Sequence, residues 1–384
     1  MEETKKWLIP AKGRKIKYLY RLLAAVLARD TLPLGIKNVC LCLNLDQCNL
    51  RCIMCWQTYA RPANRKMYHT RNIPRNDLLR LLRNKQLAEA TISVVGGGEP
   101  FLYPYLDDLL VEAPTEHRRL MIMTNGTLLH EKPLFWEIAK TAPITLSFSI
   151  DAATPETYGK IRPPGDWPVL VNNIERYVEL RRANPRLGFL SSFVVLKQNL
   201  SELMDFMRLN AKWGSEYVHI HPAISANFPE EWRVDLSDPV YLSIMAEVIE
   251  FARLHSIALD RPAELLPPEE LHHLEPASGQ DDQASSTSGA ASKWKLPPND
   301  PRRGCTMHTE SMTINHLGQV YLCDTAFRVY YTCGNVLANG IEKTWLSTEW
   351  LSVRLAHKLG VPHLHPLCQK CLFLNNGVSD LNVS

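Results

Sequence analysis

The chain has 384 residues, of which 45% are hydrophobic and 22% charged, and its formal net charge at pH 7 is +3. This charge excludes the strongly basic balance of nucleic-acid binders, so we expect no nucleic-acid partner. The length can bury one large core and a smaller second one, so we expect two domains. The ten cysteines fall into two groups, Cys40 to Cys55 and Cys305 to Cys371, which is the layout of two metal sites. No signal peptide is visible, and a cytoplasmic location is expected.

Residues 1–35 predict a basic amphipathic helix. Apolar residues such as Ile16 and Leu23 recur at helical spacing among basic residues such as Lys15. We expect this helix to pack against the main domain rather than to bind a membrane surface. The uncharged run from Leu22 to Ala28 is far too short to span a bilayer, so no transmembrane segment is predicted.

Residues 36–256 predict an α/β fold, a partial (β/α)6 TIM-like barrel. Short aliphatic or β-branched runs alternate with segments of helical periodicity, which is the pattern of repeated strand and helix units around a parallel sheet. The candidate strands are residues 37–45, 91–95, 119–124, 144–150, 187–196 and 217–221. The candidate helices are residues 75–89, 105–113, 133–140, 169–182 and 201–213.

Chemically unusual residues follow the first four candidate strands. They are the cysteines Cys48, Cys52 and Cys55, then Gly96-Gly97-Gly98-Glu99-Pro100, Thr124-Asn125-Gly126 and Ser149-Ile150-Asp151. In parallel barrels the carboxyl ends of the strands share one face, so these residues are expected to form one site. Three thiolates would leave one iron of a four-iron cluster open to a small-molecule ligand. A zinc site or a set of buried thiols is the alternative, although no fourth ligand lies nearby in the sequence.

The Cys-x3-Cys-x2-Cys spacing, together with the glycine-rich and Ser149-Ile150-Asp151 segments, resembles the radical S-adenosylmethionine enzymes over residues 36–222. The resemblance implies that the three cysteines hold a [4Fe-4S] cluster whose open iron binds S-adenosylmethionine. It also implies reductive cleavage to a 5'-deoxyadenosyl radical, with a flavodoxin or ferredoxin-type electron donor. The residues expected at S-adenosylmethionine are Met54, Gly97, Gly98, Glu99, Ser149, Asp151 and Asn199.

The end of the chain predicts a second metal site. Residues 257–303 lose all periodicity and predict a flexible linker or insertion, and residues 304–384 predict a small α+β domain with a hairpin turning near Gly318. This domain resembles the SPASM/twitch auxiliary-cluster domain of the same superfamily. The resemblance implies one auxiliary [4Fe-4S] cluster on Cys305, Cys323, Cys368 and Cys371, with no further cysteine after them. A structural zinc site on the same four thiols is the alternative.

Three further residues are candidates for a catalytic role. His219 and His221 alternate at the end of the sixth candidate strand, so both point to one side and could bind substrate or accept a proton. A structural pair hydrogen-bonded to neighbouring loops is the alternative. Cys333 is left over from the second cysteine group and is interpreted as a buried thiol, an alternative cluster ligand or a hydrogen-atom donor.

The first functional expectation is a radical enzyme acting on a small polar metabolite, such as a sugar or aminocyclitol unit of a natural product. The reaction would be a dehydrogenation, an epimerisation or a decarboxylation. This expectation depends on the single auxiliary cluster and on the segment before Ile36, which is too short for a peptide-recognition domain. The second is a maturase that modifies a ribosomal peptide. The third, from a different class, is a non-catalytic iron-sulfur or zinc-binding protein.

Overall fold

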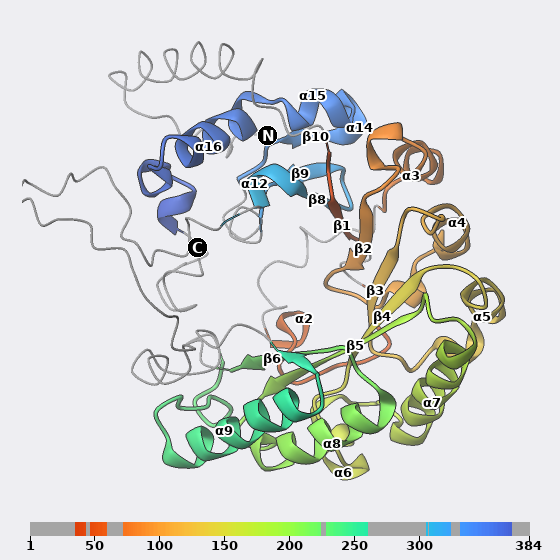
Figure 1. The fold of residues 1–384 in the computed structure, drawn as a ribbon, viewed down its shortest axis with the longest axis vertical. Helices are drawn as coiled ribbons and strands as arrows, with labels where there is room; N and C mark the ends of the chain where they lie inside the picture. Colours follow the sequence, from red (N-terminus) through yellow and green to blue (C-terminus); the bar gives the residue numbers. More distant parts are fainter. Residues whose placement is uncertain are drawn as a thin grey trace, which may run out of the picture.

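The computed structural model describes residues 35–43, 47–59, 72–223, 228–259, 305, 307–323 and 331–370. Its strands form a single sheet in the order β10-β9-β8-β1-β2-β3-β4-β5-β6-β7. Figure 1 shows that the sheet is strongly curved and that helices α3 to α9 lie along its outer side. The predicted partial TIM-like barrel is therefore confirmed.

All six predicted strands are present, and each is parallel to its neighbours. They are β1 (Asn38–Cys42), β2 (Thr91–Val95), β3 (Leu120–Thr124), β4 (Ile144–Ser149), β5 (Gly188–Val195) and β6 (Tyr217–Pro222). A seventh strand, β7 (Ala258–Leu259), pairs in parallel with β6 and was not predicted. Two residues are too few to show a strand period, so the sequence pattern could not indicate it.

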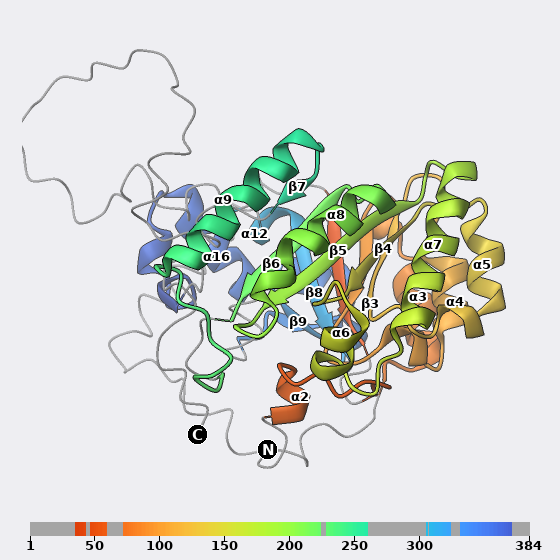
Figure 2. The same ribbon diagram turned by 90° about the horizontal axis from the view of Figure 1, so that it is seen from below.

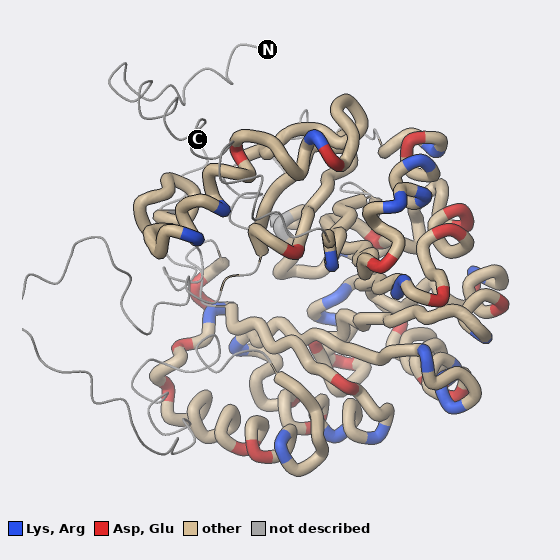
Figure 3. The backbone as a smooth tube through the Cα atoms, turned by 45° about the horizontal axis from the view of Figure 1, so that its top comes forward, with Lys and Arg blue, Asp and Glu red and all other residues tan. Residues whose placement is uncertain are grey.

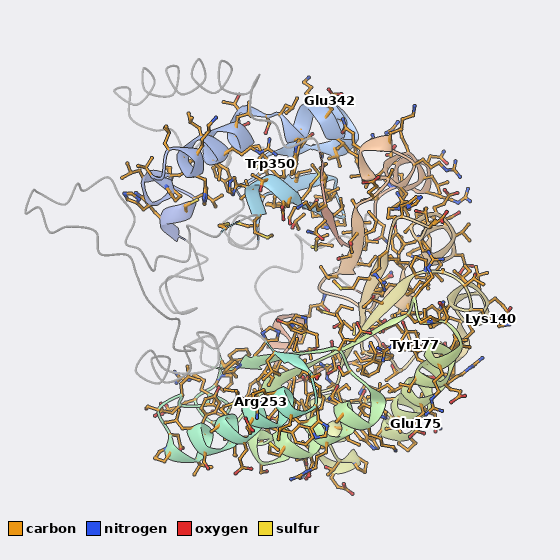
Figure 4. The ribbon with its side chains drawn as sticks, viewed as in Figure 1. Lys140, Glu175, Tyr177, Arg253, Glu342 and Trp350 are labelled. Atoms are coloured by element: carbon orange, nitrogen blue, oxygen red, sulfur yellow. The ribbon has the colours of Figure 1, made fainter. Side chains whose placement is uncertain are left out.

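The outer helices cover the sheet with one apolar face each. They are α3 (Arg75–Leu82), α4 (Leu106–Glu112), α5 (Pro133–Ala139), α6 (Pro155–Ile161), α7 (Trp167–Ala183), α8 (Leu203–Trp213) and α9 (Pro239–Leu254). Tyr177 on α7, labelled in Figure 4, donates its hydroxyl to the carbonyl oxygens of Ile144 and Gly188, each at 3.0 Å. A fully buried tyrosine thus joins its helix to two strands while satisfying its own polar atom.

The C-terminal residues continue the barrel sheet instead of forming a sheet of their own. The described elements are α12 (Met307–Glu310), β8 (Ser311–Asn315), β9 (Gln319–Tyr321), β10 (Gly334–Asn335), α14 (Val336–Asn339), α15 (Ile341–Trp345) and α16 (Thr348–Lys358). Strand β8 pairs in parallel with β1, and the predicted hairpin between β8 and β9 is confirmed. Its turn needs a glycine, because Gly318 has a φ of 75° and an added Cβ would lie 2.4 Å from Leu337 Cγ.

Two predicted segments fall largely outside the described residues, namely the helix expected in residues 1–35 and the linker expected in residues 257–303. Residues 257–259 of that linker are described, and two of them form β7 instead. Among the helices that the structure describes, none is long and apolar enough to cross a membrane. Figure 3 shows basic and acidic residues interspersed along the outer helices. Oppositely charged neighbours form ion pairs, such as Lys140 Nζ with Glu137 Oε2 at 2.7 Å. This mixture of charges agrees with the small net charge of the whole chain.

Candidate functional site: a three-cysteine loop at the strand ends

The loop from Cys48 to Cys55 lies at the carboxyl ends of the parallel strands, and Figure 2 shows the helix that follows it, α2 (Trp56–Tyr59), on the side toward which the strand arrows point. Its apolar residues form a small buried cluster, separate from the main core, with residues at the ends of α6, β5 and β6. The members of this cluster are Leu50, Cys52, Met54, Ile161, Leu196 and Ala223. The loop therefore reaches from the first strand to the opposite wall of the barrel.

Backbone hydrogen bonds fix the loop against the end of α6. The Arg51 amide donates to the carbonyl oxygen of Pro163 at 2.5 Å, and the Ile53 amide donates to that of Ile161 at 2.9 Å. The Arg51 guanidinium also donates to the Cys48 carbonyl oxygen at 2.6 Å, within the loop itself. These bonds hold the three thiols in place before any metal binds, which reduces the ordering that binding must supply.

The thiols are ligands suited to soft metals, and burial keeps two of them, Cys48 and Cys52, protonated while no metal is bound. Burial raises the pKa of the Cys48 thiol, and burial raises that of Cys52 to about 11, although the neighbouring Arg162 opposes the rise. Iron binding must therefore displace protons from Cys48 and Cys52. Three thiolates from one short loop fit a [4Fe-4S] cluster that leaves one iron for another ligand.

A buried ion pair supports this loop, and sequence reasoning missed its basic member. Arg162 follows α6 directly, its Nε donates to Asp151 Oδ2 at 2.7 Å, and its Nη1 lies 3.6 Å from Cys52 Sγ. The second oxygen of Asp151 accepts the Val194 amide at 2.7 Å. The sequence did contain a signal for this cation, because the Asp151 carboxylate follows an apolar strand and needs a positive charge nearby once it is buried.

Glu99 joins the glycine-rich loop to the loop after β3. It is 2% exposed; its Oε1 accepts the Phe101 amide and the Thr124 hydroxyl at 3.1 and 2.6 Å, and its Oε2 accepts the Asn125 amide at 2.8 Å. Burial raises the pKa of this carboxyl group, while these three donors oppose the rise. Glu99 therefore holds two strand-end loops together, and its predicted contact with S-adenosylmethionine stays a prediction.

The loop after β3 also contacts the cysteine loop. Asn125 Nδ2 donates to Asn49 Oδ1 at 2.8 Å and lies 4.0 Å from Cys48 Sγ, and Asn49 in turn donates to the Thr127 hydroxyl at 2.8 Å. Sequence reasoning treated Thr124-Asn125-Gly126 as part of the site without assigning these roles. The polar Asn49 between two cysteines was a usable signal, because its amide must pair with something near the cluster.

The other residues predicted to contact S-adenosylmethionine differ in how far they are buried. Gly97, Gly98 and Ser149 are half-buried at the strand ends, where the prediction places the ligand. Asp151 and Asn199 have no exposed surface; Asn199 donates to the carbonyl oxygens of Asp151 and Val194 and accepts the Leu196 amide. These two side chains build the wall behind the site, and neighbouring groups would have to move before either could touch a ligand.

Met54 is also buried, packed within the small cluster rather than lying open beside the cysteines. This packing anchors the cysteine loop through an apolar side chain. A contact between Met54 and the adenine stays a prediction.

His219 and His221 lie on the same face of β6, as the alternation of side chains along a strand predicts. His219 and His221 point away from Val218 and Ile220, which are fully buried on the other face of β6, and their rings stack with centroids 5.9 Å apart. His219 is half-buried and His221 is exposed. The shared face is confirmed, and the catalytic role stays a prediction.

The second cysteine group contains histidines that the sequence analysis did not include. Cys305, Cys323 and Cys368 are half-buried, Cys371 lies outside the described residues, and Cys368 Sγ is 3.7 Å from His357 Nε2. Burial lowers the pKa of His308 to about 3, with the adjacent His357 adding to the effect, so the His308 imidazole is neutral. Neutral imidazole and thiolate are both metal ligands.

Cys333 lies inside the main core with no exposed surface, and burial raises the pKa of its thiol well above the usual range. Its amide donates to the Val320 carbonyl oxygen at 2.7 Å. Of the three interpretations, a buried thiol fits this position, because a hydrogen-atom donor must reach the substrate.

The fold and the two cysteine groups define a radical S-adenosylmethionine enzyme with a C-terminal SPASM domain. Residues 45–209 match the family model described as the radical SAM superfamily, and residues 305–372 match the SPASM iron-sulfur cluster-binding domain. The chain belongs to this class of enzymes. Its cofactors are accordingly a [4Fe-4S] cluster that binds S-adenosylmethionine, S-adenosylmethionine itself and an auxiliary iron-sulfur cluster.

Individual relatives extend over both domains. The mycofactocin maturase MftC of Mycobacterium tuberculosis is 23% identical over 324 residues, which cover 84% of this chain and 73% of MftC. Streptococcus suis SuiB, solved with its precursor peptide SuiA, superposes with a TM-score of 0.60 at 16% identity, covering 85% of this chain and 68% of SuiB. The enzyme anSMEcpe, solved with AdoMet and the Cp18Cys peptide, gives a TM-score of 0.53 at 16% identity, with 88% of each chain covered. These structural matches support the fold.

The expectation of a small polar metabolite as substrate is wrong. The relative that matches along most of the chain is named a maturase, and both solved structures contain peptides. The error came from two weak arguments, the count of auxiliary cysteines and the short segment before Ile36. Neither argument was drawn from residues of a substrate-binding site, so neither could report the chemistry of the substrate.

Replacing Glu99 with glutamine is expected to lower the free energy of unfolding by about 1–3 kcal/mol. Glutamine keeps only one accepting oxygen, so at least one buried donor loses its partner: the Asn125 amide if the new nitrogen replaces Oε2, or both Phe101 and Thr124 if it replaces Oε1. Urea unfolding of the purified chain measures the loss. Glu112→Gln is the matched control, because Glu112 pairs with Arg83 at the surface and should cost less than about 1 kcal/mol. Equal losses in the two variants would contradict the role assigned to Glu99.

Proposed function

We propose that this enzyme is a peptide maturase, a radical S-adenosylmethionine enzyme that modifies a precursor peptide. The observation that carries the proposal is the similarity to MftC, which spans 84% of the chain and therefore includes both the barrel and the SPASM domain. The peptide-bound structures of SuiB and anSMEcpe support it at the level of fold. A non-catalytic metal protein would not need a loop such as Cys48 to Cys55, whose three cysteines would leave one iron of a four-iron cluster for another ligand.

In this proposal each group of site residues has a separate role. Cys48, Cys52 and Cys55 would hold the cluster, which with S-adenosylmethionine supplies a 5'-deoxyadenosyl radical that removes a hydrogen atom from the peptide. Arg162 and Asp151 hold the cysteine loop in position. Glu99 and Asn125 connect the neighbouring strand-end loops, and the histidines of β6 are the candidates for accepting a proton from the peptide.

The proposal is tested by measuring 5'-deoxyadenosine from the anaerobically reconstituted enzyme with S-adenosylmethionine and a reductant. Synthetic peptides encoded by short reading frames beside the gene are compared with the low-molecular-weight fraction of a cell extract. We expect one peptide to raise 5'-deoxyadenosine formation and to change in mass. Stimulation by the small-molecule fraction alone, with every peptide unchanged, would overturn the proposal.

A further inference from the structure

Two histidines and two cysteines of the C-terminal domain form one compact group, which we call the histidine–cysteine cluster: Cys305, His308, His357 and Cys368. The Cys305 sulfur and one nitrogen from each histidine all lie within 4.8 Å of one another. The Cys368 sulfur is 3.7 Å from His357 Nε2. Three potential ligand atoms, from Cys305, α12 and α16, are therefore close enough to bind one metal centre, and Cys368 lies beside this group through its contact with His357.

The position of the histidines is fixed by the helix that faces them. Trp350, Arg354 and His357 are spaced by four and then three residues on α16, so they lie on one face. The Trp350 indole and the Arg354 guanidinium both donate to the His308 carbonyl oxygen, at 2.7 and 2.8 Å. Figure 4 labels Trp350, which lies between α16 and the strands. These bonds lock α12 onto α16 and bring the two imidazole rings into a stack 4.1 Å apart.

One histidine nitrogen of this group has no hydrogen-bond partner among the described residues. His308 is 8% exposed, and its Nδ1 atom is buried with no hydrogen-bond partner among the described residues. His365 in the same domain is equally buried, but its Nε2 lies 3.1 Å from the Ser352 hydroxyl and its Nδ1 accepts the Leu367 amide at 3.2 Å. A buried imidazole nitrogen without a partner is costly, and a metal ligand bond would remove that cost.

We propose that the auxiliary iron-sulfur centre of this enzyme takes nitrogen as well as sulfur ligands. Cys305 and Cys368 supply thiolates, and the His308–His357 pair supplies a ring nitrogen, with His357 the better placed because it lies beside both sulfurs. A neutral imidazole in place of an anionic thiolate reduces the negative charge on a cluster and raises its reduction potential, as in Rieske centres. The proposal concerns the cofactor and is independent of the peptide as substrate.

The experiment uses the full chain with Cys48, Cys52 and Cys55 all replaced by alanine, so that only the auxiliary centre remains after anaerobic reconstitution. Pulsed electron paramagnetic resonance of the reduced protein detects nitrogen bound to iron. We expect a strongly coupled nitrogen in this background. His357→Cys should remove the coupling while keeping the iron, because cysteine can replace the ligand, and should lower the midpoint potential. If His308→Cys removes the coupling instead, His308 is the ligand within the proposed pair.

The matched control is His365→Ala, which removes a histidine of equal burial whose nitrogens are already hydrogen-bonded. Its nitrogen coupling should equal that of the parent chain. Three results would overturn the proposal: no strongly coupled nitrogen in the parent, a coupling that survives in both His357→Cys and His308→Cys, or a protein that binds zinc with no auxiliary iron.

Discussion

Replacing Cys52 with alanine is expected to abolish formation of 5'-deoxyadenosine and to remove about four iron atoms per chain, which is one [4Fe-4S] cluster. Cys52 supplies one of only three protein thiolates in the loop, and its sulfur lies beside Arg162 in a buried position. The two remaining thiolates cannot hold a four-iron cluster that already leaves one iron to S-adenosylmethionine. Iron analysis and chromatography of the reaction products, both performed anaerobically, measure the two losses.

Cys42→Ala is the matched control for this prediction. Cys42 is a buried thiol at the end of β1, only a few residues from the loop. Its removal leaves a small cavity and should lower stability modestly, without changing the iron content or the amount of 5'-deoxyadenosine. If Cys42→Ala and Cys52→Ala lost iron equally, the loss would reflect a general disruption of the fold. The assignment of the Cys48 to Cys55 loop as the cluster-binding loop would then lose its support.

The barrel could be predicted from sequence because its local signals agree with its packing. Strand β2 occupies the predicted residues, and α7 starts where Asp166 accepts the Val169 amide ahead of a proline in the first turn. The parallel pairing of β8 with β1 could not be predicted, because the partners are separated by most of the chain. No local period encodes such a long-range contact.

The sequence predicted the cysteine ligands of the candidate site but not the residues that hold these ligands in place. The cysteine spacing identifies Cys48, Cys52 and Cys55 because metal ligands on one loop leave a sequence pattern. The bond from Arg162 to Asp151 joins two side chains brought together only by the fold of α6 over β4. The same is true of His357 and Cys368, which meet through α16. Residues that act through tertiary contacts carry no spacing signal of their own.

The Arg162→Met variant is expected to lose about 3–5 kcal/mol of unfolding free energy, because it leaves the Asp151 carboxylate buried without its cation. Both partners are buried, with Arg162 7% exposed and Asp151 fully covered. The same substitution removes the contact with Cys52 Sγ and should weaken retention of the first cluster. Denaturant unfolding measures the stability, and iron content after gel filtration measures the retention.

Arg118→Met separates the two effects. Arg118 is equally buried, and its guanidinium donates to the carbonyl oxygens of Ala113 and Leu82, each at 2.5 Å, beside residues of α3 and α4 that do not contact the cysteine loop. Its loss should destabilise the barrel through unsatisfied buried carbonyls while leaving the first cluster intact under conditions where the protein stays folded. Loss of the cluster in Arg118→Met would show that stability alone controls iron retention.

The double variant Arg162→Met with Asp151→Asn tests whether Arg162 acts on the cluster itself. Removing both charges should recover part of the stability lost in Arg162→Met, because no buried charge is left unpaired, and asparagine tolerates the positive φ of 62° at this position. The cation beside Cys52 is still absent, and reduction adds negative charge to the cluster. Loss of the Asp151 charge acts in the opposite direction, but that charge acts on the Cys52 thiol less than Arg162 does, so the midpoint potential should stay below that of the wild type even where stability is recovered. A potential that returned to the wild-type value would limit Arg162 to a structural role.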